Sequence, residues 1–391
     1  MKVLFVHNCY GIVSGEELML ERIMSLLRSR GHEVSSYLAH SSTIRTPGQK
    51  LGAGLSSLWS PKSRRELREL LRVDPPDLVQ VQNLYPLISP SVLPVIKEAE
   101  IPIVMRLSNY RLICPNGLLL SHGRVCERCR GGREYHCVLR NCERSRIKSI
   151  SYATRSWFSR VAGLYRKNVT RYYAQTHFQR QVIADEGYPE DRIDVIPNML
   201  DAPKDVAAWT PGSFVGFVGR LSEEKGVRVL FEAARSLPDI PFHLAGDPSS
   251  MPSGGSIPSN VSLRGQLAGV ELTRFYEGAA MIVAPSIWYE GFPSVIIEAM
   301  AHTRPVIASS IGGLPEIVLD GETGTTPPPG DSDALARAIL GLWKNPARRR
   351  AYGEAGALRV REQYSSQRYY ERLMRTYQAA RAAAQGEIHA L

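Results

Sequence analysis

The sequence lacks any run of apolar residues long enough to cross a membrane, because no stretch approaches the roughly 18 that a spanning helix needs. It also lacks the hydrophobic region of a secretory signal, since the apolar run Val3–Val6 ends at His7. No internal repeat with a period of about 20–50 residues and no long low-complexity tract is present. We therefore expect a soluble, cytoplasmic protein rather than a membrane-spanning, secreted or repeat protein.

Cysteine is scarce, with 6 in 391 residues, and five of the six are clustered. A reducing compartment argues against a disulfide framework. The spacing of Cys126, Cys129, Cys137 and Cys142 suits a tetrahedral structural zinc site, with Cys114 as a fifth candidate ligand. Reduced core or loop thiols are an equal alternative, and a redox pair is a lesser one. Four protein ligands would leave no open position on the metal for catalysis.

Positive charge is concentrated in the first half of the chain. Residues 1–185 hold 28 Lys and Arg against 14 Asp and Glu, whereas residues 186–391 hold 20 against 24. The formal charges of the two halves are therefore +14 and −4. This asymmetry predicts that the first half meets an anionic partner and that the second half has another task. Nucleic acid, an acidic membrane face and a phosphorylated small substrate all fit such a partner.

Hydrophobic patterning predicts two α/β domains. Short apolar runs without strict alternation are typical of parallel strands covered on both faces. In the first half they occur at residues 2–7, 77–82, 101–107 and 172–175. In the second half we expect strands at 213–219, 241–245, 281–285 and 305–309 and helices at 227–237 and 294–302. The alternation predicts two doubly wound parallel sheets.

These predicted elements define the expected domain bounds. The first domain spans residues 1–190 and carries a Cys-rich insertion at 114–142. The second spans residues 191–365, and a helix at 366–391 is long enough to cross back to the first domain.

Two glutamates lie eight residues apart across a turn that leads into a predicted helix. Glu290 lies in the turn before Phe292 and Pro293, and Glu298 lies about one turn inside the helix. Backbone N–H groups beside a helix N-terminus attract anionic or polyhydroxylated ligands. Carboxylates there can accept hydrogen bonds from vicinal hydroxyls. From the spacing alone, a capped surface helix with two solvated acids is an equal alternative.

Five segments resemble, in order and spacing, the retaining glycosyltransferases of the GT-B fold, the bacterial group 1 or family 4 type that is related to sucrose and glycogen synthases. The segments are Val195–Asn198, Val218–Gly226, Ala284–Ala301 with its Glu-x7-Glu pattern, Ser310–Val318 and Asp320–Gly324. The resemblance covers nearly the whole chain and is strongest over residues 190–335. It implies two Rossmann-like domains that face a cleft.

The resemblance also implies roles for single residues. Arg220 and Lys225 contact the donor diphosphate and assist catalysis together with Glu290, while Glu298 binds the nucleotide ribose. The residues implied to hold the rest of the donor are Gly291, Phe292, Pro293, Gly15 and Asn198. Physical reasoning supports the two cations, because the departing nucleoside diphosphate gains negative charge in the transition state. Taken alone, the alternative is a surface Arg and Lys beside acidic neighbours.

Two segments of the first half depart from the family pattern. Ser14-Gly15-Glu16 stands where the family has Gly-Gly-Glu, so only the second glycine is present. Ser108 stands where the family has a histidine that contacts the donor sugar, and Ser108 and Asn109 are candidate contacts to donor sugar or acceptor. Because the phosphate and Glu-x7-Glu segments are intact, we interpret Ser108 as altered recognition rather than as loss of activity.

The region around the cysteines is strongly basic. Residues 101–185 hold 16 Lys and Arg against 4 Asp and Glu. Within it, residues 155–167 interleave basic and aromatic side chains. Such a segment can lie on an acidic leaflet or bind an anionic acceptor. A solvated helical face is the alternative.

The sequence as a whole predicts a retaining glycosyltransferase of cell-surface polysaccharide or glycoconjugate biosynthesis. We expect a UDP- or GDP-sugar donor, a saccharide or lipid-linked acceptor, no cofactor for the chemistry, and a position in the cytoplasm or at the inner face of the membrane. A soluble small-molecule acceptor, a nucleotide-sugar epimerase, an inactive transferase and a zinc-stabilised nucleic-acid binder are the alternatives. Nucleic acid is disfavoured because it leaves the acidic second half and its motifs unexplained.

Overall fold

The computed structural model describes residues 1–10, 15–201, 209–252 and 256–389. It divides into two compact units, the first comprising residues 1–119, 126–197 and 369–391 and the second residues 120–125 and 198–368. The chain thus changes unit after Pro197, whereas the sequence placed the boundary at 190. In the part of the chain that the structure describes, no helix combines the length and the apolar character needed to cross a bilayer.

The second unit is built on a parallel sheet, which among the described residues has six strands in the order β11-β10-β9-β12-β13-β14. Their bounds are β9 (Phe214–Val218), β10 (Phe242–Ala245), β11 (Val261–Gly265), β12 (Ala279–Ala284), β13 (Val306–Ala308) and β14 (Gly324–Thr325). The four strands predicted for this half are therefore confirmed. No apolar run indicated β14, which has two residues, or the half-exposed edge strand β11.

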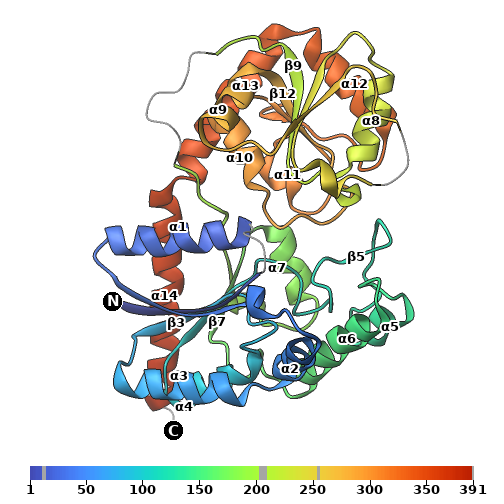
Figure 1. The fold of residues 1–391 in the computed structure, drawn as a ribbon. Helices are drawn as coiled ribbons and strands as arrows, with labels where there is room; N and C mark the ends of the chain where they lie inside the picture. The colour runs from blue at the N-terminus through green and yellow to red at the C-terminus, as the bar shows by residue number, and fades with distance from the viewer. Residues whose placement is uncertain (11–14, 202–208, 253–255, 390–391) are drawn as a thin grey trace. The chain divides into compact units, whose positions relative to one another are not determined.

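Helices cover both faces of this sheet (Figure 1). One face packs against α8 (Val227–Arg235) and α12 (Ser332–Trp343). The other packs against α9 (Gly269–Gly278), α10 (Ser294–Ala301), α11 (Leu314–Ile317) and α13 (Pro346–Gln363). Adjacent residues of one strand serve opposite layers, since Val215 belongs to the first layer and Phe214 to the second. This two-sided burial explains why the strands are continuously apolar.

The first unit has a second parallel sheet, with strand order β2-β1-β3-β4-β7-β8 in its described residues. The strands are β1 (Lys2–Cys9), β2 (Glu33–His40), β3 (Leu78–Val81), β4 (Ile103–Arg106), β7 (Arg171–Ala174) and β8 (Ile193–Val195). The four predicted strands are again confirmed. The edge strand β2 was missed because its serines and half-exposed positions do not form an apolar run.

The helices of the first unit are α1 (Gly15–Ser29), α2 (Pro47–Leu58), α3 (Pro61–Val73), α4 (Leu93–Glu98), α5 (Tyr135–Leu139), α6 (Arg146–Val161), α7 (His177–Ala184) and most of α14 (Ser366–His389). Short 3-10 turns of this unit occur at Ser41–Thr43, Pro90–Val92 and Glu190–Arg192.

The second unit has 3-10 turns at Glu223–Lys225 and Pro248–Ser250. It also includes a two-stranded hairpin of β5 (Leu120–Ser121) and β6 (Arg124–Val125).

Helix α14 packs on the sheet of the first unit through buried tyrosines. The hydroxyl of Tyr377 donates to the side-chain oxygen of Gln80 on β3. The amide of Gln80 donates to the hydroxyl of Tyr173 on β7 at 2.9 Å, and that hydroxyl lies 3.3 Å from the hydroxyl of Tyr369. The C-terminal helix, which the sequence assigned to residues 366–391, thus forms part of the first unit from Tyr369 onward.

The strand order of each sheet marks where a ligand is expected. In the second unit the chain runs from β9 outward to β10 and β11 and then returns to β12 on the other side of β9. In the first unit β2 and β3 likewise flank β1. In open α/β sheets, ligands bind beyond the carboxyl ends of the strands at such a reversal. The loops after β9, β12, β1, β3 and β4 are therefore the positions of interest.

Candidate active site

In the second unit, the strand reversal brings together Lys225 and Glu290, which lie 65 residues apart in the sequence. Strands β9 and β12 pair in parallel, so their carboxyl ends lie at the same edge. The loop after β9 carries Lys225 and the loop after β12 carries Glu290. The Nζ atom of Lys225 lies 2.6 Å from Oε1 of Glu290. The structure thus joins two of the three predicted catalytic residues in one ion pair.

Glu290 is a buried carboxylate held in its charged form. It is 5% exposed, and its Oε1 also accepts a hydrogen bond from the hydroxyl of Ser286 at 2.6 Å. Burial acts to raise the pKa of Glu290, but the charge of Lys225 and the hydrogen bonds from Lys225 and Ser286 outweigh it, so the pKa is lowered. The ring of Trp288 lies 5.8 Å from the Lys225 ammonium and adds a cation–π contact. The glutamate is therefore available as a hydrogen-bond acceptor at neutral pH.

Glycine at position 226 fixes where Lys225 lies. Gly226 has φ +76° and both ends the 3-10 turn of residues 223–225 and begins α8. A Cβ atom on Gly226 would lie 1.8 Å from the carbonyl oxygen of Pro285, which directly follows β12. The amide of Ile287 donates to the carbonyl of Glu224 at 3.0 Å. The two loops are thus held together through their backbones.

Arg220, the third predicted catalytic residue, lies apart from this ion pair. Its side chain is largely exposed, and its guanidinium lies 2.9 Å from Oε1 of Glu224. That carboxylate also accepts from the hydroxyl of Ser222 at 2.7 Å. Arg220 is therefore a surface cation paired with an acidic neighbour, which was the alternative given for both cations. Lys225 is not, because it pairs with the distant Glu290.

The turn between the two glutamates is anchored by Asn198. Its side-chain amide donates to the carbonyl of Phe292 at 3.1 Å, and the Phe292 ring packs edge-on against Tyr364 at 5.3 Å between centroids. Pro293 is the N-cap residue of α10 and has no N–H. The resemblance assigned the backbone amides of Gly291, Phe292 and Pro293 to the donor sugar, but only Gly291 and Phe292 have an N–H to offer, so the assignment is wrong for Pro293.

Glu298 lies on α10, within the same unit. It is half-buried and accepts a hydrogen bond from the hydroxyl of Tyr276 at 2.9 Å. Burial and the neighbouring Glu298 raise the pKa of Tyr276 well above its ordinary value, so the phenol remains a donor. The ring of Tyr276 stacks on His302 with centroids 5.3 Å apart. Sequence reasoning missed Tyr276, and nothing in the spacing could have indicated it.

The first unit has its own pocket at the carboxyl ends of β3 and β4. Its lining includes Glu16, Asn83, Ser108 and Asn109. The hydroxyl of Ser108 accepts from Nη1 of Arg106 at 3.0 Å, and the side-chain oxygen of Asn109 accepts from the amide of Arg111 at 3.0 Å. The two predicted sugar or acceptor contacts therefore lie side by side in one pocket.

Charged and amide side chains that the sequence did not single out build this pocket. Asn83 accepts from Nη1 of the half-buried Arg111 at 2.5 Å. Glu16 accepts from the hydroxyl of Tyr10 at 3.0 Å and from the amide of Gln82 at 3.1 Å. Tyr10, Gln82 and Asn83 directly follow the ends of β1 and β3, and this position was the only feature of the sequence that could have indicated them as pocket residues.

Gly15 is the first residue of α1, and a Cβ atom there would meet no atom within 4 Å. The fold itself therefore does not require glycine at this position. Ser14, which departs from the family pattern, lies outside the described residues.

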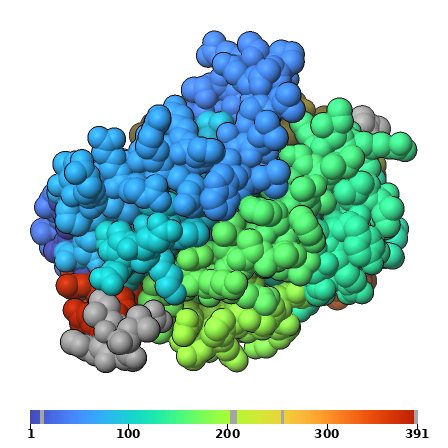
Figure 2. Space-filling model, turned by 90° about the horizontal axis from the view of Figure 1, so that it is seen from below, coloured from blue at the N-terminus to red at the C-terminus, as the bar shows by residue number. Residues whose placement is uncertain are grey.

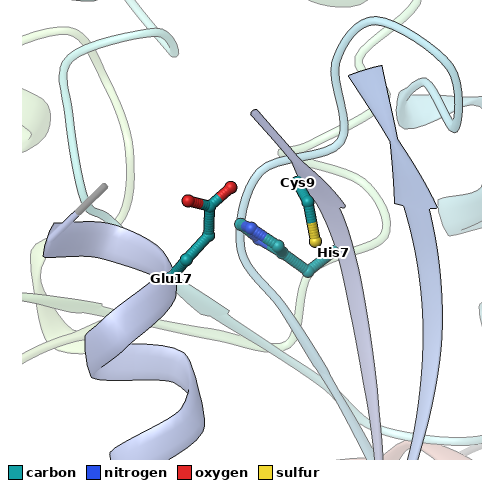
Figure 3. Close-up of side chains that lie close together, drawn as sticks. All are labelled: His7, Cys9 and Glu17. Carbon is teal, nitrogen blue, oxygen red and sulfur yellow. The ribbon is translucent and has the colours of Figure 1, made fainter. Parts of the chain in front are cut away.

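Three side chains near the end of β1 come close enough together to suggest a metal site (Figure 3). The ligand atoms of His7, Cys9 and Glu17 lie within 4.8 Å of one another. However, Nδ1 of His7 accepts the amide N–H of Asn83 at 3.3 Å, so the neutral ring carries its proton on Nε2 and has no free lone pair. Burial lowers the pKa of His7 and raises that of the Cys9 thiol. The chemistry of this cluster therefore does not fit a metal site.

The cysteine cluster stays a candidate for zinc. Cys129 and Cys137 are buried beside Ala153, and Cys142 packs against them. Burial and the neighbouring thiols raise the pKa of Cys129 to about 12, and the Cys142 thiol and burial raise that of Cys137 further. Within the described chain, no three of the sulfurs lie within 4.8 Å of one another. Because zinc-bound thiolates lie only about 3.8 Å apart, this spacing is looser than a formed site. Zinc therefore remains a prediction, which the metal content of the purified chain tests.

Comparison with known proteins finds similarity to glycosyltransferases. Residues 212–345 match the family model described as "Glycosyl transferases group 1". The alpha-maltose-1-phosphate synthase of Mycolicibacterium smegmatis is 31% identical over 229 residues, which cover 49% of this chain and 58% of that protein. The phosphatidyl-myo-inositol mannosyltransferase of Mycobacterium leprae is 31% identical over 191 residues, covering 47% of this chain and 51% of that protein. The chain thus spans about half the length of the curated relatives it matches.

Solved structures show the same architecture along nearly the whole chain. A glycosyltransferase from Rickettsia africae ESF-5 has a TM-score of 0.69 at 17% identity and covers 97% of this chain and 98% of its own. Anabaena Alr3699/HepE in complex with UDP has a TM-score of 0.66 at 18% identity and covers 97% and 100%. At these identities the likeness shows the fold alone. The predicted GT-B fold, with two parallel-sheet α/β domains, is confirmed.

Proposed function

Because the chain carries a group 1 glycosyltransferase domain at residues 212–345, as its motifs predicted, we propose that it transfers a sugar from a nucleotide-sugar donor to a saccharide or lipid-linked acceptor. We propose further that the anomeric configuration is retained and that the reaction serves cell-surface polysaccharide or glycoconjugate biosynthesis. The observation that carries the proposal is the Lys225–Glu290 ion pair at the strand reversal of the second unit.

In this proposal, Lys225 binds and stabilises the departing diphosphate. Its ammonium has three donors, so it can keep one hydrogen bond to Glu290 and direct another at a phosphate oxygen. Negative charge grows on that oxygen as the bond to the sugar breaks, which strengthens the interaction in the transition state. Arg220 is exposed and can exchange Glu224 for a phosphate, because surface ion pairs are weak.

Glu290 holds the donor sugar. Its Oε1 receives both Lys225 and Ser286, and we assign Oε2 to a sugar hydroxyl. The N–H groups of Gly291 and Phe292 precede α10 and suit a second oxygen of the donor. Glu298, fixed by Tyr276, is assigned to the nucleotide ribose. The acceptor is assigned to the pocket of the first unit that contains Ser108 and Asn109.

The donor is tested first by thermal unfolding with UDP, GDP, ADP and dTDP. A ligand that binds the folded state alone raises the melting temperature. We expect UDP or GDP to do so, since Anabaena Alr3699/HepE, a protein of the same fold, was crystallised with UDP and with UDP-glucose. No shift with any of the four nucleotides would contradict donor binding and favour the inactive or nucleic-acid alternatives.

The roles are tested by substitution. Lys225→Ala is expected to lower the rate of sugar transfer by about 10²–10³-fold, the usual loss when one transition-state donor is removed. Lys344→Ala, which removes an exposed lysine at the end of α12 in the same unit, is the matched control and should leave the rate unchanged. Transfer by Lys225→Ala or Glu290→Ala within twofold of the parent would overturn the assigned roles.

A further inference from the structure

Helix α6 presents large apolar side chains to solvent. Ile147 is 82% exposed, and Ile150, Trp157 and Val161 are each at least half exposed. Their spacing of three, seven and four residues places them on one face of the helix. The residues that α6 buries are instead Ser149, Ala153, Arg155 and Ser159. This pattern is the inverse of a helix that packs its apolar face into its own protein.

Helix α2 continues the exposed apolar surface. Leu51, which is 70% exposed, Leu55 and Trp59 recur every fourth residue and are all exposed. The two helices are neighbours, because a Cβ on Gly54 would lie 3.9 Å from the hydroxyl of Ser151 on α6. The ring of Trp59 meets that of Phe158 edge-on at 6.3 Å. Figure 2 shows α2, in blue, projecting beside the green surface of the segment that contains α6. We call these two exposed stripes the α2–α6 face.

The charged residues within the two segments that contain these helices are all basic. No Asp or Glu occurs between residues 34 and 65 or between residues 144 and 184. The exposed basic residues on or beside the two helices are Arg45, Lys50, Arg144, Arg146 and Lys148. Glu143, which precedes Arg144, is half-buried, and the exposed charged residues of these two segments are all basic. An apolar stripe with such neighbours complements a surface that carries negative charge over an apolar interior.

We propose that the α2–α6 face docks the protein on an anionic lipid bilayer. The apolar side chains would enter the interface between headgroups and acyl chains, where Trp59 and Trp157 are suited by their amphipathic rings. The flanking Lys and Arg attract anionic headgroups. A two-fold pairing of this face with a second copy would place like charges opposite one another. Docking on a bilayer does not depend on the proposed function. The further statement that the protein reaches a lipid-linked acceptor there rests on the proposed function.

The docking surface overlaps only in part with the basic segment 155–167 that the sequence indicated, since Trp157 and Val161 belong to both. Arg155 is 3% exposed and lies over the rings of Tyr152 and Tyr85, at 3.7 and 4.2 Å from their centroids. Leu164 and Tyr165 are also buried. These residues belong to the interior of the first unit, so the lipid contact is assigned to the opposite face of α6 and to α2.

The test is flotation of the full chain with large vesicles, without donor or acceptor. Vesicles of phosphatidylcholine with about one-third phosphatidylglycerol are compared with phosphatidylcholine alone, each at low and high salt. We expect binding to the anionic vesicles that weakens as salt is raised. Because no sugar nucleotide is present, this result is independent of the nucleotide test of the proposed function.

Matched substitutions locate the surface. Ile147→Ser with Trp157→Ser should weaken vesicle binding at least tenfold, whereas Val270→Ser, at an equally exposed apolar residue of the second unit, should leave it unchanged. Lys148→Glu should weaken binding at least fivefold, since each basic charge near an anionic surface contributes about that factor. Lys344→Glu is its control. All of these side chains are exposed, so thermal unfolding should be unaffected.

Three outcomes would overturn the proposal. The first is the absence of vesicle binding by the parent chain at low salt. The second is concentration-dependent self-association that Ile147→Ser with Trp157→Ser abolishes, which would assign the face to a second copy. The third is salt-sensitive binding of an oligonucleotide, lost in Lys148→Glu, together with no binding to vesicles. If vesicles bind and nucleotides do not, the docking surface stands and the proposed transfer activity fails.

Discussion

The two units end their central strands in different ways. In the second unit, the loops after β9 and β12 meet through backbone, with Gly226 so close to Pro285 that no side chain fits. In the first unit, the corresponding edge has an open glycine, Gly15, and is filled by hydrogen-bonded side chains around Asn83 and Arg111. Backbone contacts leave little freedom for substitution, whereas a side-chain network can be rebuilt from other residues. The family match at residues 212–345 falls within the second unit.

The comparison also fits the division of labour that we propose. UDP- and GDP-sugar donors share a diphosphate, so a rigid loop with one fixed cation suits it. Acceptors differ in shape and polarity, and a pocket lined by Ser108, Asn109 and amide side chains can be altered one contact at a time.

The largest effect should come from Gly226→Ala. The new Cβ would collide with the Pro285 carbonyl at 1.8 Å, and φ +76° is unfavourable for alanine. We expect the free energy of unfolding to fall by about 4 kcal/mol or more, or the second unit to fail to fold. Gly321→Ala has a similar φ of +75° but open space, and should cost about 1–2 kcal/mol by urea unfolding. Equal losses in the two variants would refute the role of backbone contact.

Lys225→Ala tests the buried ion pair of the same unit. The substitution leaves Glu290 buried without its cation, and the carboxylate can escape by taking up a proton at a cost of about 3 kcal/mol at pH 7. We expect a loss of about 2–3 kcal/mol in the free energy of unfolding, measured by urea denaturation. Adding Glu290→Gln should recover most of it. If the double variant is no more stable than the single one, the charge of Glu290 does not depend on Lys225.

Asn83→Ala tests the side-chain network of the first unit. Asn83 is 4% exposed, accepts from Arg111 and donates to the carbonyl of Asn8 at 2.6 Å. Its loss leaves buried partners unsatisfied and should cost about 2–3 kcal/mol. Asn168→Ala removes a half-buried asparagine with one hydrogen bond, to Leu164, and should cost about 1 kcal/mol or less. A similar loss in the free energy of unfolding for both variants, measured with urea, would mean that the buried hydrogen bonds of the first unit do not depend on Asn83.

The smallest expected effect is the opposite pH dependence of two acids, the half-buried Glu143 and the buried Glu290. Burial raises the pKa of Glu143 in the first unit, so its charged form destabilises the fold increasingly as the pH rises above about 4.5. Glu143→Gln should therefore stabilise the protein at pH 7 by about 0.5 kcal/mol, after allowance for solvent screening, and have no effect near pH 4.

Glu290 should show the opposite sign. Its pKa is lowered, so its contribution to stability is present above about pH 4.5 and is lost as the pH falls through the lowered value. Unfolding free energies of the parent and Glu143→Gln across pH 4–8 test whether charged Glu143 destabilises the fold. If charged Glu290 stabilises it, the loss in unfolding free energy caused by Lys225→Ala should shrink as the medium is acidified. A Glu143→Gln variant that is less stable at pH 7 would contradict the assignment.

The strands were predictable because a strand that is buried on both faces consists of consecutive apolar residues. This held for β1, β3, β4 and β7 in one unit and for β9, β10, β12 and β13 in the other. It failed for β2, whose alternation of exposed and half-buried residues is typical of an edge strand. The positions of Arg220, Lys225, Glu290 and Glu298 followed from motif spacing, while Ser286, Trp288 and Tyr276 could not be inferred, because their contacts join residues distant in the sequence.

The sequence by itself determined the two α/β domains, the glycine at position 226 that shapes the loop after β9 and the charge asymmetry between the halves. These features depend on local periodicity, on backbone conformation and on composition. Tertiary structure decided that Lys225 pairs with Glu290 while Arg220 pairs with Glu224. It also decided that α6 buries Arg155 and exposes Ile147. Such choices depend on which strands become neighbours and which face of a helix meets the sheet, and both are fixed only when distant segments pack together.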